Sequence, residues 1–148
     1  METNKRTYEI VIIGVSLGGL HAVKTIIEKI PDIFPLPIVI VQHRESKSDQ
    51  TLQMLLANYG HLNVVEPEDK DKIMVGNIYL APPDYHLLIE ENHFSLSKDA
   101  PVNYSRPSID VLFESAADTF GDKTIGIILT GSSTDGALGL AAIKNSGG

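Results

Sequence analysis

The feature that most constrains the fold is a set of short, apolar, β-branched runs, each followed by a segment with helical periodicity. The clearest runs are 8–13 (YEIVII), 37–41 (PIVIV) and 124–129 (TIGIIL). Strands that are apolar along their whole length are typical of a parallel sheet covered on both faces. Their alternation with helices predicts a doubly wound α/β fold, in which a mostly parallel sheet lies between two helical layers.

The remaining elements follow from spacing and from turn residues. Short apolar runs at 63–65 and 78–81 predict two more strands. The segments 86–89 and 93–97 predict a small hairpin at an edge of the sheet. Ser108 is a favourable N-cap, because its hydroxyl oxygen can accept a hydrogen bond from the first turn of a helix. The predicted helices are 18–30, 49–58, 109–120 and 134–145.

The composition fits a single domain and excludes several kinds of site. The 148 residues are 43% hydrophobic and 21% charged, which is enough apolar material for one core. With 12 basic and 19 acidic residues the net charge is −7, which disfavours nucleic acid and anionic membranes as partners. The sequence has no cysteine, which excludes disulfides, a cysteine nucleophile and thiolate metal ligands.

The two ends of the chain carry further expectations. The polar start lacks an apolar signal core, and no apolar run approaches the length of a bilayer span. We therefore expect a cytoplasmic chain without membrane insertion. Gly147-Gly148 ends the last predicted helix, a pattern that normally leads into another strand. We expect residues 1–148 to form one domain that lacks its C-terminal strand or strands.

Ser16 lies in a motif that is typical of a nucleophilic serine. The run Gly14-Val15-Ser16-Leu17-Gly18 matches G-x-S-x-G between a predicted strand and a predicted helix. Its glycines permit a sharp turn that would lift the serine side chain above the sheet. Backbone N–H groups at the start of the helix, including that of Leu17, would stabilise an oxyanion.

His43 and Asp135 complete a candidate triad. His43 ends the second predicted strand, and histidine is the side chain best suited to take a proton at neutral pH. Asp135 follows strand 124–129 and would orient the imidazolium if that strand lies on the other side of the first. The chain order Ser, His, Asp differs from the order Ser, Asp, His of α/β-hydrolases, so a different fold is expected.

Each of these residues also has a non-catalytic interpretation. The Gly14–Gly19 loop could cradle a phosphate or a nucleotide. The lack of an acidic residue at the end of the second strand weakens a dinucleotide site. His43 could simply end a strand, and Asp135 could satisfy the backbone donors of a helix N-terminus.

Five segments that span nearly the whole chain are characteristic together: 13–19 (IGVSLGG), 41–43 (VQH), 78–89 (IYLAPPDYHLLI), 106–117 (RPSIDVLFESAA) and 125–140 (IGIILTGSSTDGALGL). In these segments and in their order the chain resembles the catalytic domain of the chemotaxis protein-glutamate methylesterases, the CheB family. The resemblance implies a serine hydrolase that demethylates glutamate γ-methyl esters on methyl-accepting chemoreceptors, releases methanol, and deamidates certain glutamines. It implies a doubly wound α/β sheet.

The resemblance implies roles for the same three residues: Ser16 as nucleophile, His43 as general base and then acid, and Asp135 as its partner. It implies no cofactor, and His86 and His93 fit no standard metal-ligand spacing. The implied partners are chemoreceptor cytoplasmic domains. A separate response regulator or kinase stays open as a further partner, because the chain begins at the catalytic strand, without the receiver domain common in the family.

Four residues are secondary candidates for the oxyanion site or the substrate rim. Leu17 and Ser132 stand where the family often has threonine and methionine. Arg106 would meet acidic receptor residues, or would only fix a loop. His86 would line the rim, or would be an ordinary hairpin residue. The departures at Leu17 and Ser132 leave a non-catalytic regulatory or docking relative as an alternative to the enzyme.

Overall fold

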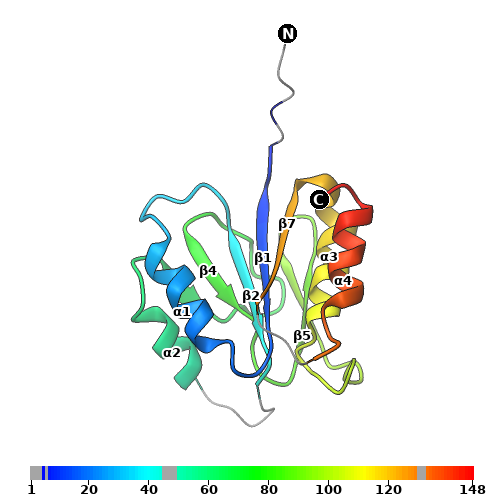
Figure 1. Cartoon of the computed structure of the whole chain (residues 1–148), viewed down its shortest axis with the longest axis horizontal. Coiled ribbons are helices and arrows are strands. Elements are labelled where there is room, and N and C mark those ends of the chain that lie inside the picture. Colours follow the sequence, from blue (N-terminus) through cyan, green and yellow to red (C-terminus); the bar gives the residue numbers. More distant parts are fainter. Residues whose placement is uncertain (1–4, 6, 45–49, 130–132) are drawn as a thin grey trace.

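A computed structural model describes residues 5, 7–44, 50–129 and 133–148. Within them a five-stranded sheet is covered by helices on both faces, and a two-stranded sheet lies apart from it (Figure 1). No described helix has the length and apolar character needed to cross a membrane. The strands are β1 (Ile10–Val15), β2 (Ile38–Gln42), β3 (Asn63–Val65), β4 (Asn77–Leu80), β5 (His86–Ile89), β6 (Phe94–Ser97) and β7 (Thr124–Leu129). The helices are α1 (Leu20–Lys29), α2 (Thr51–Ala57), α3 (Ile109–Phe120) and α4 (Ala137–Asn145), with a short 3-10 turn at Gly121–Lys123.

The main sheet is parallel throughout and has the order β3-β4-β2-β1-β7. This confirms the predicted doubly wound sheet. It also meets the condition set for Asp135, that strand 124–129 lies on the other side of the first strand. β1 lies between β2 and β7, and the chain adds its later strands on opposite sides of it. In such sheets the crevice at the carboxyl end of the strands, near this switch point, is where ligands bind. The carboxyl ends point downward in Figure 1.

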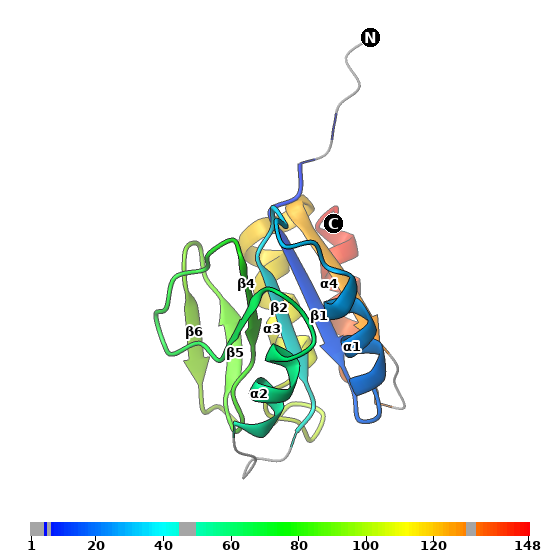
Figure 2. The same ribbon diagram turned by 90° about the vertical axis from the view of Figure 1, so that its left-hand side faces the viewer.

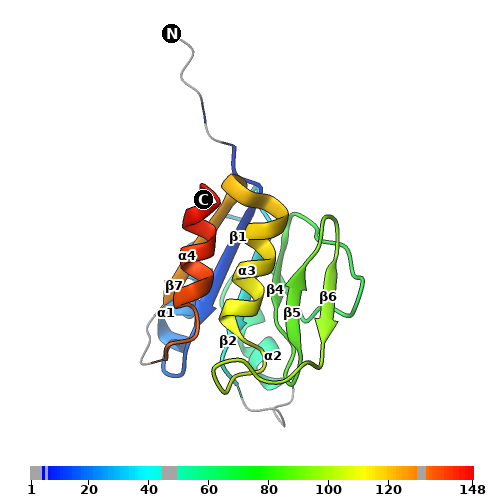
Figure 3. The same cartoon turned by 90° about the vertical axis from the view of Figure 1, so that its right-hand side faces the viewer.

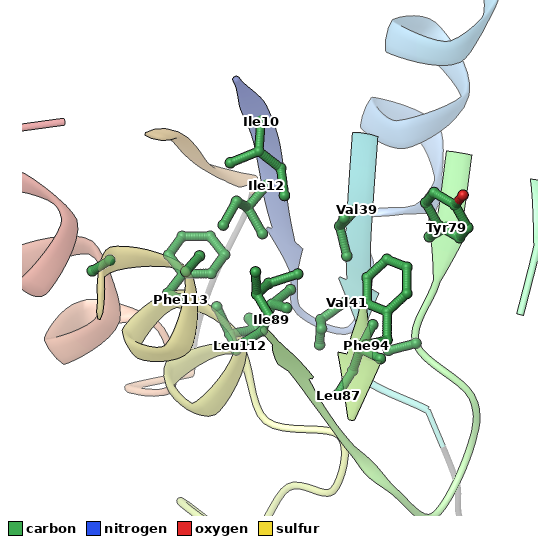
Figure 4. Packing of buried hydrophobic residues seen from close by; sticks show 14 of the residues in the cluster. Ile10, Ile12, Val39, Val41, Tyr79, Leu87, Ile89, Phe94, Leu112 and Phe113 are labelled. Carbon is green, nitrogen blue, oxygen red and sulfur yellow. The ribbon is translucent and has the colours of Figure 1, made fainter. Parts of the chain in front are cut away.

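Alternate residues of the strands feed two separate cores, which is why the strands read as continuously apolar. In β1, Ile10 and Ile12 pack with α3 and α4, whereas Val11 and Ile13 pack with α1 and α2. Figures 2 and 3 show these two helical layers from opposite sides. Figure 4 shows the first core, in which Phe113 lies against Ile12.

The predicted hairpin forms, but it lies beside α3 and not along the edge of the main sheet. β5 and β6 pair antiparallel as a sheet of their own (Figure 3). The Ile89 N–H donates to Ser115 Oγ at 2.8 Å, and Thr119 Oγ1 donates to the Ile89 carbonyl at 3.0 Å. Phe94 packs against Tyr79 of β4, with ring centroids 4.7 Å apart. The hairpin thus extends the helical layer over β2 and β4.

A glycine with positive φ delays the start of two helices relative to the prediction. α1 begins at Leu20 and not at residue 18, because Gly18 has a φ of +89°. α4 begins at Ala137 and not at residue 134, because Gly136 has a φ of +113°. Positive φ is outside the helical region, so each glycine ends a turn before the helix begins. Both turns lie at the carboxyl ends of strands and carry candidate site residues.

Candidate active site

Ser16 follows the last residue of β1 and is 4% exposed. The chain turns sharply after it, since the Gly19 N–H donates to the Ser16 carbonyl at 3.1 Å. Gly18 supplies the positive φ for this turn, as the motif predicts, and a Cβ there would meet no atom. The serine therefore lies in a strand-to-helix turn, next to the N-terminus of α1.

Gly14, the first glycine of the motif, is required for packing and not for the turn. It lies within β1, and a Cβ on it would lie 2.5 Å from Ile109 Cγ2. A Cβ on Gly136 would lie 3.1 Å from the same atom. The Ile109 side chain thus fills the space between the serine strand and the turn that follows Asp135. The missing side chains of two glycines let the first residue of α3 approach both.

We expect Gly14→Ala to destabilise the protein by roughly 1–3 kcal/mol, because the added methyl overpacks Ile109. The measurement is urea unfolding of the variant beside the wild type. In a double-mutant cycle, Gly14→Ala should cost less in an Ile109→Ala background than in the wild type, since the side chain that the new methyl meets is absent there. Strictly additive effects of the two substitutions would contradict this explanation.

His43 lies beside Ser16 across the strand pair. Val15 and Gln42 are register partners, so the residues that follow them, Ser16 and His43, come next on adjacent parallel strands. The His43 N–H donates to the Val15 carbonyl at 2.9 Å, which extends the pairing past the end of β2. Neighbouring strands are about 4.8 Å apart. The sheet itself therefore places serine and histidine together, as the sequence predicts.

Asp135 is hydrogen-bonded to this histidine: His43 Nε2 and Asp135 Oδ2 are 2.7 Å apart. The side chain of Asp135 is fully buried, and that of His43 is 10% exposed. The carboxylate is far from its partner in the sequence but adjacent in space, because β7 lies next to β1. The structure thus brings the three predicted triad residues to one end of the central strands.

The Asp135 carboxylate also lies at the N-terminus of α3. Its Oδ2 accepts from the Ile109 N–H at 2.6 Å, and its Oδ1 accepts from the Asp110 N–H at 3.0 Å. The predicted N-cap Ser108 donates its hydroxyl to Oδ1 at 2.8 Å and accepts from the Val111 N–H at 3.4 Å. Helix N-termini stabilise anions through these free N–H groups and the helix dipole. The helix-capping interpretation of Asp135 therefore holds as well, for α3 and not for its own helix.

These contacts set the ionisation of Asp135. Burial raises the pKa of Asp135. The hydrogen bonds from His43, from the Asp110 and Ile109 N–H groups and from Ser108 lower this pKa by more, so that it falls to about 2. The ordinary value is 3.8. The carboxylate is therefore ionised at neutral pH and can stabilise a positive charge on the imidazole.

This lowered pKa predicts a pH-dependent part of the stability. A carboxyl group whose pKa is depressed by folding contributes stability above its unfolded pKa and loses it as the pH falls through the folded value. We expect about 2 kcal/mol to be lost between about pH 5 and pH 2 from this group. Unfolding free energies of wild type and Asp135→Asn over this range measure it. Parallel pH curves for the two proteins would refute the assignment.

Two residues that the sequence did not single out support Asp135. Asp110 is buried, and its Oδ1 accepts from the N–H groups of Gly136 and Gly139 at 2.9 and 2.7 Å. Asp135 thus caps α3 while Asp110 caps α4. Asn103 Nδ2 lies between the carboxylates, 2.9 Å from Asp110 Oδ2 and 3.3 Å from Asp135 Oδ1. Asp135, which precedes α4, and Asp110 of α3 thus each cap the other's helix. An acidic residue in a first helical turn is a common sequence feature, so only the packing of α3 against α4 reveals this reciprocal capping.

His86 is buried, and its ring contacts the backbone of Ser108, the residue whose hydroxyl donates to Asp135. Its Nε2 lies 2.9 Å from the Ala100 carbonyl, and its Nδ1 accepts from the Ser108 N–H at 3.2 Å. A carbonyl can only accept and an N–H can only donate, so the ring carries its proton on Nε2. Both ring nitrogens thus hold backbone of the segment that leads into α3.

Arg106 forms a clamp between loops. Its guanidinium donates to Asp84 Oδ1 at 2.6 and 3.2 Å, and to the carbonyls of Lys98 and Asp99 at 3.2 Å each. The Arg106 guanidinium and then the Lys98 ammonium hold the pKa of Asp84 below its ordinary value. These bonds fit the loop-fixing interpretation of Arg106. Its role toward a substrate stays a prediction.

Leu17 and Ser132 are the candidates for the oxyanion site. Leu17 is 78% exposed, so its side chain lies in solvent directly after Ser16. Ser132 lies outside the described residues. In the described ranges no group of three or more His, Asp or Glu side chains is arranged to hold a metal ion.

A serine in a strand-to-helix turn, beside a histidine that is bonded to a buried carboxylate, is the arrangement of serine hydrolases on α/β sheets. Comparisons with known proteins agree with this class. The family model described as CheB methylesterase matches residues 11–148. The chain belongs to this CheB methylesterase family.

Individual relatives cover nearly all of the chain. A Leptospira interrogans protein, provisionally named protein-glutamate methylesterase/protein-glutamine glutaminase, is 51% identical over 142 residues, which are 95% of this chain and 74% of the relative. A Carboxydothermus hydrogenoformans protein of the same name is 41% identical over 97% of this chain, but over only 44% of its own length. The crystal structure of the Thermotoga maritima CheB methylesterase catalytic domain matches with a TM-score of 0.91, at 37% identity over 97% of this chain and 78% of that one.

Proposed function

We propose that this chain is a serine hydrolase that cleaves glutamate γ-methyl esters on proteins, and deamidates glutamines by the same route. The observation that carries the proposal is the 2.7 Å contact between His43 and the buried Asp135, at the strand end adjacent to Ser16. The family of the chain supports the substrate class.

The reaction follows from these positions. Ser16 Oγ attacks the ester carbonyl carbon and gives its proton to His43, while the carbonyl electrons move to the oxygen. Collapse of this oxyanion expels the methoxy group, which takes the proton from His43 and leaves as methanol. Water then attacks the acyl-enzyme and gives one proton to His43. Collapse of this second intermediate expels Ser16 Oγ, which takes the proton from His43. The glutamate side chain leaves as a carboxylic acid, which loses its remaining proton to solvent at neutral pH. An amide follows the same path and releases ammonia.

The nitrogen of His43 that exchanges protons is Nδ1 in this proposal. Its Nε2 is held by Asp135, so Nδ1 is the nitrogen left for Ser16. The trypsin-type triad uses the two nitrogens in the opposite roles. The backbone N–H of Leu17, at the start of the turn into α1, would stabilise the oxyanion. Ser132 would supply a second donor from its backbone.

The proposed substrates and partners are the cytoplasmic domains of methyl-accepting chemoreceptors, and the proposed location is the cytoplasm. A separate response regulator or kinase is the proposed source of control. The names of the relatives support the glutamate ester and the glutamine amide as substrates.

A phosphate-binding role for the Gly14–Gly19 loop is the weaker candidate. It does not account for a buried, ionised carboxylate bonded to the histidine beside the loop, because a negative charge there disfavours an anionic ligand. The Leu17 side chain at the tip of the turn adds no donor for a phosphate.

Methanol release tests the proposal. The purified chain is incubated with a methyl-esterified chemoreceptor cytoplasmic fragment, and methanol is measured with time. We expect release that depends on enzyme concentration and stops when the esters are consumed. No release above the no-enzyme rate would contradict the proposal.

A further inference from the structure

The loop between β6 and α3 carries a tight turn, residues 102–105. Val102 and Ser105 form an isolated antiparallel bridge, with N–H to carbonyl distances of 3.0 and 2.9 Å in the two directions. The central residues Asn103 and Tyr104 have φ values of +50° and +62°. Two consecutive positive φ values are the mark of a type I′ turn.

Asn103 fits this turn, and Tyr104 does not. Asparagine is favoured at the first central position, whereas glycine is favoured at the second. A bulky side chain at positive φ is a conformational outlier, and such outliers concentrate at functional sites. Tyr104 is also fully exposed to solvent, so no packing within the described protein compensates for the strain.

The turn is fastened to the candidate triad. Asn103 donates to Asp135 and to Asp110, the residue that caps the helix after Asp135. The turn therefore lies at the carboxyl end of the sheet, on the side of α3, at the lower end of Figure 3. The exposed Tyr104 is the next residue in the chain after Asn103, which contacts Asp135.

We propose that the turn 102–105 is a substrate-binding element: Tyr104 is a specificity-determining residue that contacts the protein surface around the esterified side chain, and Asn103 is a positioning residue that ties this contact to Asp135. This rests on the proposed function of the site. The partner is the protein that carries the glutamyl methyl ester. A tyrosine offers it a large contact area with little loss of side-chain entropy.

Substitution by glycine tests both residues without disturbing the turn, because glycine adopts positive φ freely. Methanol release is measured on two substrates with the same scissile bond, a methyl-esterified chemoreceptor fragment and N-acetylglutamate γ-methyl ester amide. Tyr104→Gly should raise KM for the fragment about tenfold, which is the effect of truncating a tyrosine that contributes strongly to an interface. The KM for the small ester should stay unchanged. Asn103→Gly should lower kcat about tenfold on both substrates with little change in KM.

Ile33→Ser is the matched control for an exposed apolar side chain. Ile33 is 92% exposed in the segment between α1 and β2, at the opposite end of the strands. This substitution should change neither kcat nor KM on either substrate. An unchanged KM of Tyr104→Gly for the fragment, or an equal change on both substrates, would overturn the proposed contact. A raised KM with an unchanged kcat for Asn103→Gly would overturn its positioning role.

Binding separates this proposal from the proposed function. The Ser16→Ala chain and its Tyr104→Gly derivative are titrated with the esterified fragment. An approximately tenfold weaker Kd of the derivative supports the contact, and equal Kd values overturn it. These outcomes hold even if the wild type releases no methanol, the result that contradicts the function itself.

Discussion

Ser16→Ala is expected to abolish methanol release from esterified receptor fragments, with a loss in kcat of at least about a thousandfold. The alanine methyl cannot attack the ester. The Ser108 hydroxyl, which contacts the Asp135 carboxylate, is engaged in capping α3. The substitution removes one oxygen from a buried position at the end of β1, so the sheet should keep its structure. Methanol release and circular dichroism of the same preparation check both expectations.

The informative control is Ser133→Ala. Ser133 is an exposed serine whose hydroxyl accepts from the Asp135 N–H, so it belongs to the same loop region without being the proposed nucleophile. A modest reduction is expected there. Full turnover by a folded Ser16→Ala chain would refute the serine mechanism and favour the non-catalytic relative as the alternative.

Asp135→Asn is expected to lower kcat by about a thousandfold to ten-thousandfold at neutral pH. The amide keeps the size of the side chain, but it no longer stabilises an imidazolium on His43. In the wild type both carboxylate oxygens accept hydrogen bonds from the first turn of α3. In the variant the amide NH₂ replaces one of these oxygens and cannot accept. We therefore expect a loss of stability together with the loss of rate.

Asp122→Asn is the matched control, because it removes the same charge from an exposed residue at the far end of α3. Its kcat should equal that of the wild type. Rates are compared at a temperature where urea unfolding shows each variant to be folded. An Asp135→Asn chain that is folded and retains most of its kcat would show that the carboxylate only caps α3.

The sequence predicted the sheet well because the information is local. Continuous apolar strands, each followed by helical spacing, indicate a parallel sheet covered on both faces. In the part of the chain that the structure describes, the strands lie within a few residues of their predicted positions. The expected C-terminal strand stays a prediction. Among the described residues β7 pairs only with β1, and nothing tests what lies beyond it.

The triad residues could be proposed from the sequence, because parallel strands bring their carboxyl ends to one edge. Ser16 and His43 need only adjacent strands to meet. The helix that Asp135 caps could not be proposed, because the first residues of α3 lie 25 and 26 positions earlier in the chain. The motif likewise pointed to Gly14 as a turn residue, although its neighbour is Ile109 of α3.

The sequence by itself therefore determined the α/β class, the strands and helices, and the three residues at the strand ends. Hydrophobic periodicity and turn residues act over a few neighbouring positions, so they can be recognised in the sequence. Only the tertiary structure decided that Asp135 and Asp110 exchange helix caps, that Asn103 joins them, and that Tyr104 is left in solvent. These contacts depend on how α3 packs against α4 and the sheet, which no local pattern specifies.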